Sequence, residues 1–164
     1  MLGLTDGFRS IERRGPDRTL VTEQTLRAGR AIVPFSDAGA RALGGAYWVE
    51  VTRATRRLLR YRETGEGVEL CILGVRPALL RFGGGEVAVG TEHVSCTYRI
   101  RGGLLALGEG GTLSVSQVGR TPTELRVAVD GFLARGGLVY ALQRRLHVAI
   151  SRRFFRRLGA EEAE

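Results

Sequence analysis

The chain has 164 residues, of which 43% are hydrophobic and 26% charged. This length predicts one domain with a core of its own, and no apolar run approaches the roughly 18 residues that a membrane-spanning helix needs. All 25 cationic side chains are arginine, so the net charge of +8 favours anionic partners while chemistry that needs a P-loop lysine or a Schiff-base lysine is excluded.

The N-terminus shows neither the long apolar stretch nor the small-residue cleavage site of a signal peptide, so we expect a cytoplasmic protein. Residues 1–18 are expected to form an extension and residues 159–164 an acidic tail. Between them, residues 19–158 are expected to form a single domain. Its first strand is predicted in "TLVTEQTLR", residues 19–27.

Helical periodicity follows this first strand. Ser36 is a plausible N-cap, and apolar residues then recur at spacings of three and four between Ala40 and Leu58. Gly44–Gly45 predicts a break between two short helices. Residues 46–56 also have the composition of a strand, so helix and strand both remain open there, with helix favoured.

Glycine clusters at 64–67, 83–85 and 108–111 separate runs of alternating apolar and polar residues, as in antiparallel strands joined by hairpins. The predicted strands are 57–63, 67–73, 78–82, 93–101, 112–117 and 124–133. In the first two, the side chains expected to point inward are Leu59, Tyr61, Val68, Leu70 and Ile72.

The chain ends in a predicted amphipathic helix of about 20 residues. Its apolar arc comprises residues 138, 139, 142, 146, 149, 150 and 154. From Arg153 onward the pattern changes, because arginines occupy the arc while Phe155 and Leu158 leave it. The sequence therefore predicts that the last turn projects beyond the sheet.

The order of these elements, up to the final "LVYALQRRLHVAISRRFFRRL" helix, resembles the START-like or helix-grip superfamily, which includes polyketide cyclases, Bet v 1-type proteins and lipid-transfer domains. The resemblance implies an α+β fold in which a curved antiparallel sheet of about seven strands wraps around a long C-terminal helix. It also implies a cavity between sheet and helix that binds an apolar or amphipathic small molecule. Cyclase-like or dehydratase-like turnover there remains open and would need no cofactor.

Four polar residues are candidates for orienting such a ligand. Tyr61, Tyr98 and Gln117 lie on otherwise apolar strand faces, and His147 lies at the edge of the helical apolar arc. Structural roles are the alternatives: a tyrosine packed in the core with its hydroxyl satisfied, a glutamine that faces solvent or pairs with backbone, and a histidine that shields the core.

The sequence shows no pattern for a metal site. His93 and Cys96 lie three apart on one predicted strand and face opposite sides, and no HExxH or CxxC motif occurs. We therefore expect no metal. Cys71 and Cys96 are predicted to be buried free thiols.

The alternative function is binding of nucleic acid or of an anionic surface through the arginine-rich C-terminal helix. Arg153, Arg156 and Arg157 would neutralise phosphate groups. In "RRFFRRL", two phenylalanines flanked by arginine pairs would also suit an anionic membrane surface. A structural or partner-binding role without a small ligand is a further possibility.

Overall fold

A computed structural model of the chain describes residues 7–15 and 19–161. Parts of the expected extension and tail, residues 1–6, 16–18 and 162–164, lie outside the described residues. The strands are β1 (Arg9–Arg14), β2 (Leu20–Ala28), β3 (Leu59–Thr64), β4 (Gly67–Ile72), β5 (Val75–Gly83), β6 (Glu86–Val89), β7 (His93–Gly102), β8 (Thr112–Val118) and β9 (Thr123–Phe132). The helices are α1 (Asp37–Ala54) and α2 (Gly137–Glu161).

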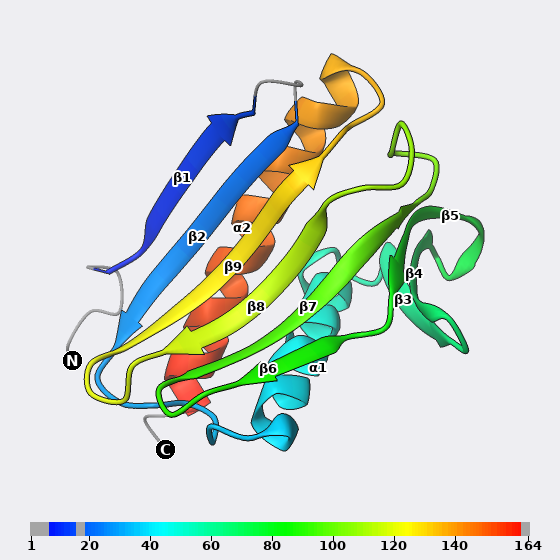
Figure 1. The fold of residues 1–164 in the computed structure, drawn as a ribbon. Helices are drawn as coiled ribbons and strands as arrows, with labels where there is room; N and C mark the ends of the chain where they lie inside the picture. Colours follow the sequence, from blue (N-terminus) through cyan, green and yellow to red (C-terminus); the bar gives the residue numbers. More distant parts are fainter. Residues whose placement is uncertain (1–6, 16–18, 162–164) are drawn as a thin grey trace.

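The nine strands form one antiparallel sheet in the order β1-β2-β9-β8-β7-β5-β4-β3, with β6 paired to β7 (Figure 1). β2 therefore lies beside the last strand, β9, although most of the chain separates them. β7 is shared, because its first half pairs with β6 and its last residues pair with β5. The short β6 is thus a branch of the sheet.

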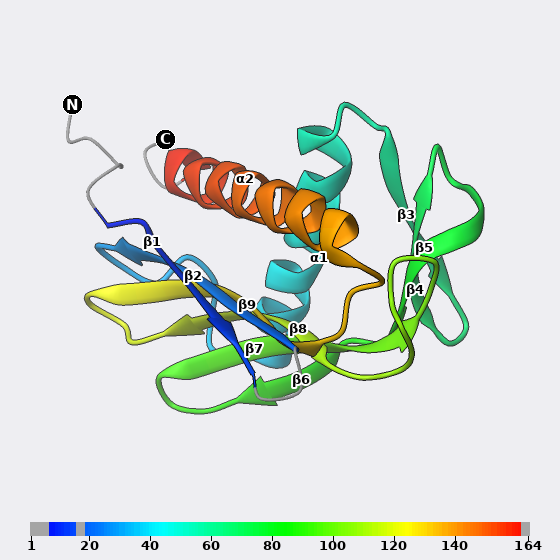
Figure 2. The ribbon, with the colours of Figure 1, turned by 90° about the horizontal axis from the view of Figure 1, so that it is seen from above.

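Both helices cover the same face of the curved sheet, so the molecule has two layers (Figure 2). This arrangement confirms the predicted α+β fold with a long C-terminal helix. The sheet has nine strands instead of about seven, because β1 and β6 were not predicted. All six residues of β1 are exposed, so this edge strand pairs with β2 through its backbone and shows no apolar alternation.

The first helix, α1, is continuous, and residues 46–54 are helical as favoured. Ser36 caps it by accepting a hydrogen bond from the Gly39 amide at 3.2 Å. The predicted break at Gly44–Gly45 is wrong. A Cβ atom at Gly44 would lie 2.3 Å from the Tyr98 hydroxyl, so this glycine marks the close approach of α1 to β7.

The second helix, α2, is buried most deeply at its C-terminal half, where Ile150, Phe154, Phe155 and Leu158 are in the core. The prediction that the last turn projects beyond the sheet is therefore wrong. At the other end, Leu138 and Leu142 are 86% and 68% exposed, although the apolar arc placed them inward. The predicted arc was centred on the apolar residues of the N-terminal half of the helix. Packing against the sheet and α1 instead buries a stripe of residues that is shifted toward Phe155.

The core beneath α1 is aromatic. The Trp48 ring packs against Phe82 at a centroid distance of 4.9 Å and against Tyr98 at 5.3 Å. Both cysteines are buried and free, as predicted. Within residues 7–15 and 19–161, no helix combines the length and apolar character needed to cross a membrane.

Candidate functional site

A tyrosine–histidine pair joins the two helices, with Tyr47 buried and His147 half-buried. The Tyr47 hydroxyl of α1 lies 3.1 Å from Nδ1 of His147 of α2, and the Phe154 ring packs edge-on against Tyr47. Burial raises the pKa of Tyr47 and lowers the pKa of His147 from 6.5 to about 4. Both side chains are therefore uncharged near neutral pH, and the pair is a neutral hydrogen bond.

Polar side chains continue from His147 along α2. Gln143 and Ser151 lie four residues before and after it, so the three share one side of the helix. Ser151 is fully buried, and its hydroxyl donates a hydrogen bond of 3.4 Å to the Gln24 carbonyl oxygen on β2. This contact shows that the side of α2 with Gln143, His147 and Ser151 faces β2.

Thr22 of β2 completes this group, because it lies two residues from Gln24 and therefore on the same face of the strand. We call Gln143, His147 and Ser151 of α2, together with Thr22 and Gln24 of β2, the polar seam. Three of its buried atoms have no hydrogen-bond partner among the described residues: Thr22 Oγ1, Gln143 Oε1 and His147 Nε2.

Gln117, a predicted ligand residue, is fully buried and holds the chain that leads into α1. Its side-chain oxygen accepts hydrogen bonds from the amides of Ile32 and Val33 at 2.7 and 3.0 Å. Its nitrogen donates to the Val33 carbonyl at 2.8 Å. Gln117 therefore pairs with backbone groups, which is the structural alternative considered for it. Both its side-chain oxygen and its side-chain nitrogen are used in these hydrogen bonds.

The two predicted tyrosines lie around Trp48. Tyr98 is buried, and burial together with the neighbouring Cys96 raises its pKa. Tyr61 is half-buried with its ring centroid 6.4 Å from that of Trp48. Because Tyr47 also contacts Trp48, at 5.8 Å, a chain of ring contacts links Tyr61, Tyr98 and His147.

Tyr47 is the site residue that the sequence did not single out. It recurs with Ala40, Leu43 and Val51 at helical spacing, and this periodicity marks it as a core residue. The signal that could have found it is the hydroxyl itself, because a buried tyrosine hydroxyl needs a partner. The structure supplies that partner from His147, 100 residues away in the sequence.

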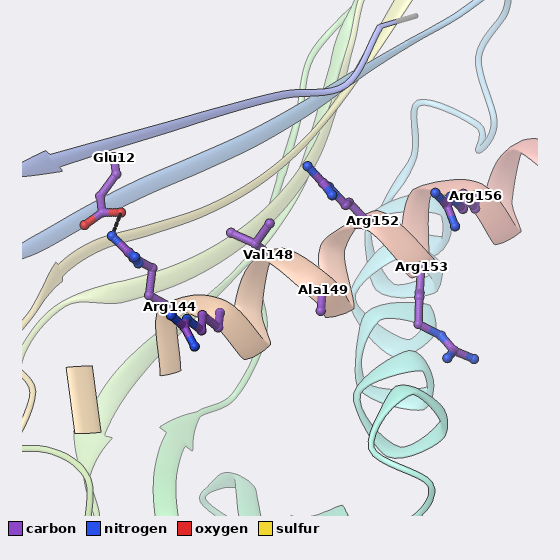
Figure 3. A pocket seen from close by; sticks show the side chains of 8 residues that line it. Glu12, Arg144, Val148, Ala149, Arg152, Arg153 and Arg156 are labelled. Atoms are coloured by element: carbon purple, nitrogen blue, oxygen red, sulfur yellow. Dashed lines mark hydrogen bonds and ion pairs between the residues drawn. The ribbon is translucent and has the colours of Figure 1, made fainter. Parts of the chain in front are cut away.

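A groove of about 580 Å³ runs beside α2 (Figure 3). Its lining consists of Glu12, Arg144, Arg145, Val148, Ala149, Arg152, Arg153 and Arg156. Glu12 accepts hydrogen bonds from the Tyr140 hydroxyl and, at 3.3 Å, from Arg144. A second concavity, of about 650 Å³, lies beside residues 30–35 and Arg120. Neither is lined by the polar seam.

The three arginines predicted to meet an anionic partner divide into two groups. Arg153 and Arg157 approach the buried carboxylate of Glu50 on α1 at 3.3 and 3.9 Å, and so hold the two helices together. Arg156 lines the groove, as does Arg145, and both side chains are exposed. The partner of Glu50 was not predictable from the sequence, because the contact depends on how α1 and α2 cross.

Comparison with known proteins gave no match to a family model, a curated protein or a solved structure. Within the part of the chain that the structure describes, no cluster of three or more His, Cys, Asp or Glu side chains could hold a metal ion. Function is therefore argued from the fold and from the chemistry of these side chains.

Proposed function

We propose that the protein binds a small apolar or amphipathic molecule between the sheet and α2, with the polar group of the ligand against the polar seam. The observation that carries the proposal is the set of three buried polar atoms without partners: Thr22 Oγ1, Gln143 Oε1 and His147 Nε2. Buried polar groups in folded proteins nearly always have a partner. A polar group of a bound ligand would supply these missing partners. A water molecule would supply them when no ligand is bound.

The neutral Tyr47–His147 pair defines the polar group that fits. When the Tyr47 hydroxyl donates to Nδ1, the imidazole proton resides on Nε2, which then offers a donor. Gln143 Oε1 offers an acceptor one helical turn away. A hydroxyl both accepts and donates, so a hydrophobic molecule with a hydroxyl group matches the seam.

The end of α2 nearest Gln143 supports entry of an apolar molecule. Leu138 and Leu142 are exposed there, and the segment that leads into α2 pairs with the β7–β8 loop through Leu107 N–Leu133 O at 3.0 Å. Leu104, Leu107 and Leu133 are exposed as well. Five exposed leucines at one end of the helix would form an apolar rim.

The packing of α2 against the sheet and the pairing of β2 with β9 support membership of the START-like, helix-grip superfamily. This membership is part of the proposal. In a cyclase-like or dehydratase-like reaction, His147 and Tyr47 would be the pair that transfers a proton, since both are neutral and hydrogen-bonded.

Native mass spectrometry of the purified protein tests the proposal. We expect an adduct that survives native conditions, is lost on denaturation, and decreases in His147→Leu but not in Arg145→Gln on the outer side of the same helix. Saturable binding of Nile red, a neutral apolar probe, should compete with the adduct. Absence of an adduct together with absence of saturable Nile red binding would refute the proposal.

The arginine groove favours a second candidate function, the binding of nucleic-acid phosphates. Arg145, Arg152 and Arg156 follow one side of α2 at spacings of seven and four residues, and Glu12 is the one acid in the lining. Arginine matches phosphate oxygens well. A mobility-shift titration with single-stranded DNA should show salt-sensitive binding that Arg145→Gln/Arg156→Gln weakens; no shift at low salt would remove this candidate.

A further inference from the structure

The turn between β4 and β5 holds a leucine in a backbone conformation that leucine seldom adopts. Leu73 has φ 51° and the following Gly74 has φ 78°, as in a two-residue type I′ hairpin turn. Asparagine, aspartate and glycine are the residues that suit the first of these positions, and a bulky residue there is strained. Leu73 is nevertheless present, with 56% of its surface exposed.

This strain is concentrated in one region. Within residues 7–15 and 19–161, the non-glycine residues with positive φ are Arg56, Arg57 and Leu73. The first two lie in the turn that follows α1, and the next residue joins that turn to the β4–β5 turn, since the Leu73 amide donates to the Leu58 carbonyl at 2.7 Å. Strained backbone in folded proteins is concentrated at functional positions.

Apolar side chains surround this contact. Leu58, Ile72, Leu73 and Val75 are all exposed, and we call them the apolar tip. The prediction that Ile72 points inward is wrong, since Cys71 is the buried residue at this end of β4 and Ile72 is 47% exposed. The tip belongs to the β3–β5 part of the sheet, which lies at the opposite edge from β1 (Figure 1).

Arginines flank the apolar tip. Segments 53–62 and 70–81 together contain seven arginines and no acid. Arg56, Arg57 and Arg60 are exposed beside Leu58, and Arg76 is exposed beside Val75. Among the described residues, Glu69 pairs with Arg62 and Arg76 and is placed farther along β4. The tip is therefore an apolar surface bordered by cations.

We propose that the apolar tip inserts into the interfacial region of an anionic lipid bilayer, with the surrounding arginines on the lipid phosphates. An exposed apolar surface bordered by arginines matches such an interface, because acyl chains accept the leucines and headgroups attract the cations. Each arginine near the surface contributes roughly fivefold to the partition coefficient. The C-terminal "RRFFRRL" segment does not offer this surface, since Phe154 and Phe155 are buried.

Leu73→Asn provides a sharp test, because asparagine suits the left-handed backbone and removes the apolar side chain. Val89→Asn is the matched control, since Val89 is also an exposed aliphatic residue, at 43%, but lies on β6, which pairs with the opposite end of β7 from β5. Co-sedimentation would use phosphatidylcholine vesicles with and without about 30% phosphatidylserine. Urea unfolding of each variant would show that it is folded.

We expect the unaltered protein to sediment with the anionic vesicles and not with phosphatidylcholine alone. Leu73→Asn should lower the partition coefficient at least about tenfold at equal or higher stability, while Val89→Asn leaves it unchanged. Equal binding of Leu73→Asn, or binding independent of phosphatidylserine, overturns the proposal. A dimer in light scattering that Leu73→Asn converts to a monomer also overturns it, in favour of a second copy as the occupant.

Discussion

Adjacent glycines in α1 should respond in opposite directions to the same substitution. Alanine in a helix interior is favoured over glycine by about 1 kcal/mol, and both Gly44 and Gly45 lie in the middle of α1. No atom lies within 4 Å of a Cβ placed at Gly45. Gly45→Ala should therefore raise the free energy of unfolding by about 1 kcal/mol.

At Gly44 the added methyl group meets the sheet. Its Cβ would lie 2.3 Å from the Tyr98 hydroxyl and 2.9 Å from Cys96 Sγ. Neither side chain has free space, because Gly85 also packs against both. Overpacking of this kind costs about 1–3 kcal/mol and is offset by the helical gain of about 1 kcal/mol, so Gly44→Ala should lower the free energy of unfolding by up to about 2 kcal/mol.

Urea unfolding followed by tryptophan fluorescence measures both changes. Trp48 is the single tryptophan of the chain and packs on Tyr98, so its emission reports this contact. Thermal midpoints should differ in the same direction, by about 2–4 °C per kcal/mol for a chain of this size. If Gly44→Ala proved as stable as Gly45→Ala, the close approach of α1 to β7 would be refuted.

Three further changes test the polar contacts of the interior. Because the pKa of His147 falls from 6.5 to about 4 on folding, the unfolded chain binds more protons between these values, and stability should fall by up to about 3 kcal/mol as pH drops through this window. His147→Gln should flatten that dependence in urea titrations across pH. Arg153→Ala leaves a buried carboxylate without its nearest cation and should cost about 1–3 kcal/mol in thermal unfolding, against less than about 0.5 kcal/mol for Arg156→Ala. Gln117→Leu removes three hydrogen bonds, and should cost about 2–3 kcal/mol and speed tryptic cleavage at Arg30.

Each of these expectations has a contradicting result. An unchanged pH dependence in His147→Gln would show that other groups set the acid sensitivity. Equal costs for Arg153→Ala and Arg156→Ala would show that the helix-to-helix ion pair contributes nothing measurable. Tryptic cleavage of Gln117→Leu at the rate of the unaltered chain would show that the segment before α1 is held by other contacts.

The strands of the sheet were predictable where one face is covered. β7 alternates over its whole length, and Cys96 and Tyr98 are buried as its pattern indicates. β1 was not predictable in this way, because an exposed edge strand is held by backbone pairing and leaves no apolar pattern. A pattern of apolar residues in the sequence indicates which side chains are buried, and β1 has no buried side chain.

The candidate site was only partly predictable, because its contacts join distant segments. His147 was identified from its place on α2, but its partner Tyr47 depends on the crossing of the two helices. The contact of Glu50 with Arg153 depends on the same crossing. A helix pattern alone does not set that geometry, and it did not set the rotation of α2 about its own axis.

The branching of the sheet at β7 has a mechanical consequence. Two residue pairs, Arg81 with Gly102 and Phe82 with Ile100, register β5 with β7, whereas eight register β2 with β9. The β3–β5 part is thus joined to β7 by few residue pairs, with two further backbone hydrogen bonds from Leu104 and Leu105 to Ala78 and Leu79, so its amides should exchange with solvent faster than those of β2 and β9. Because Tyr61 and Phe82 of this part pack on Trp48, which contacts Tyr47, a movement of the apolar tip would reach the Tyr47–His147 pair through these rings.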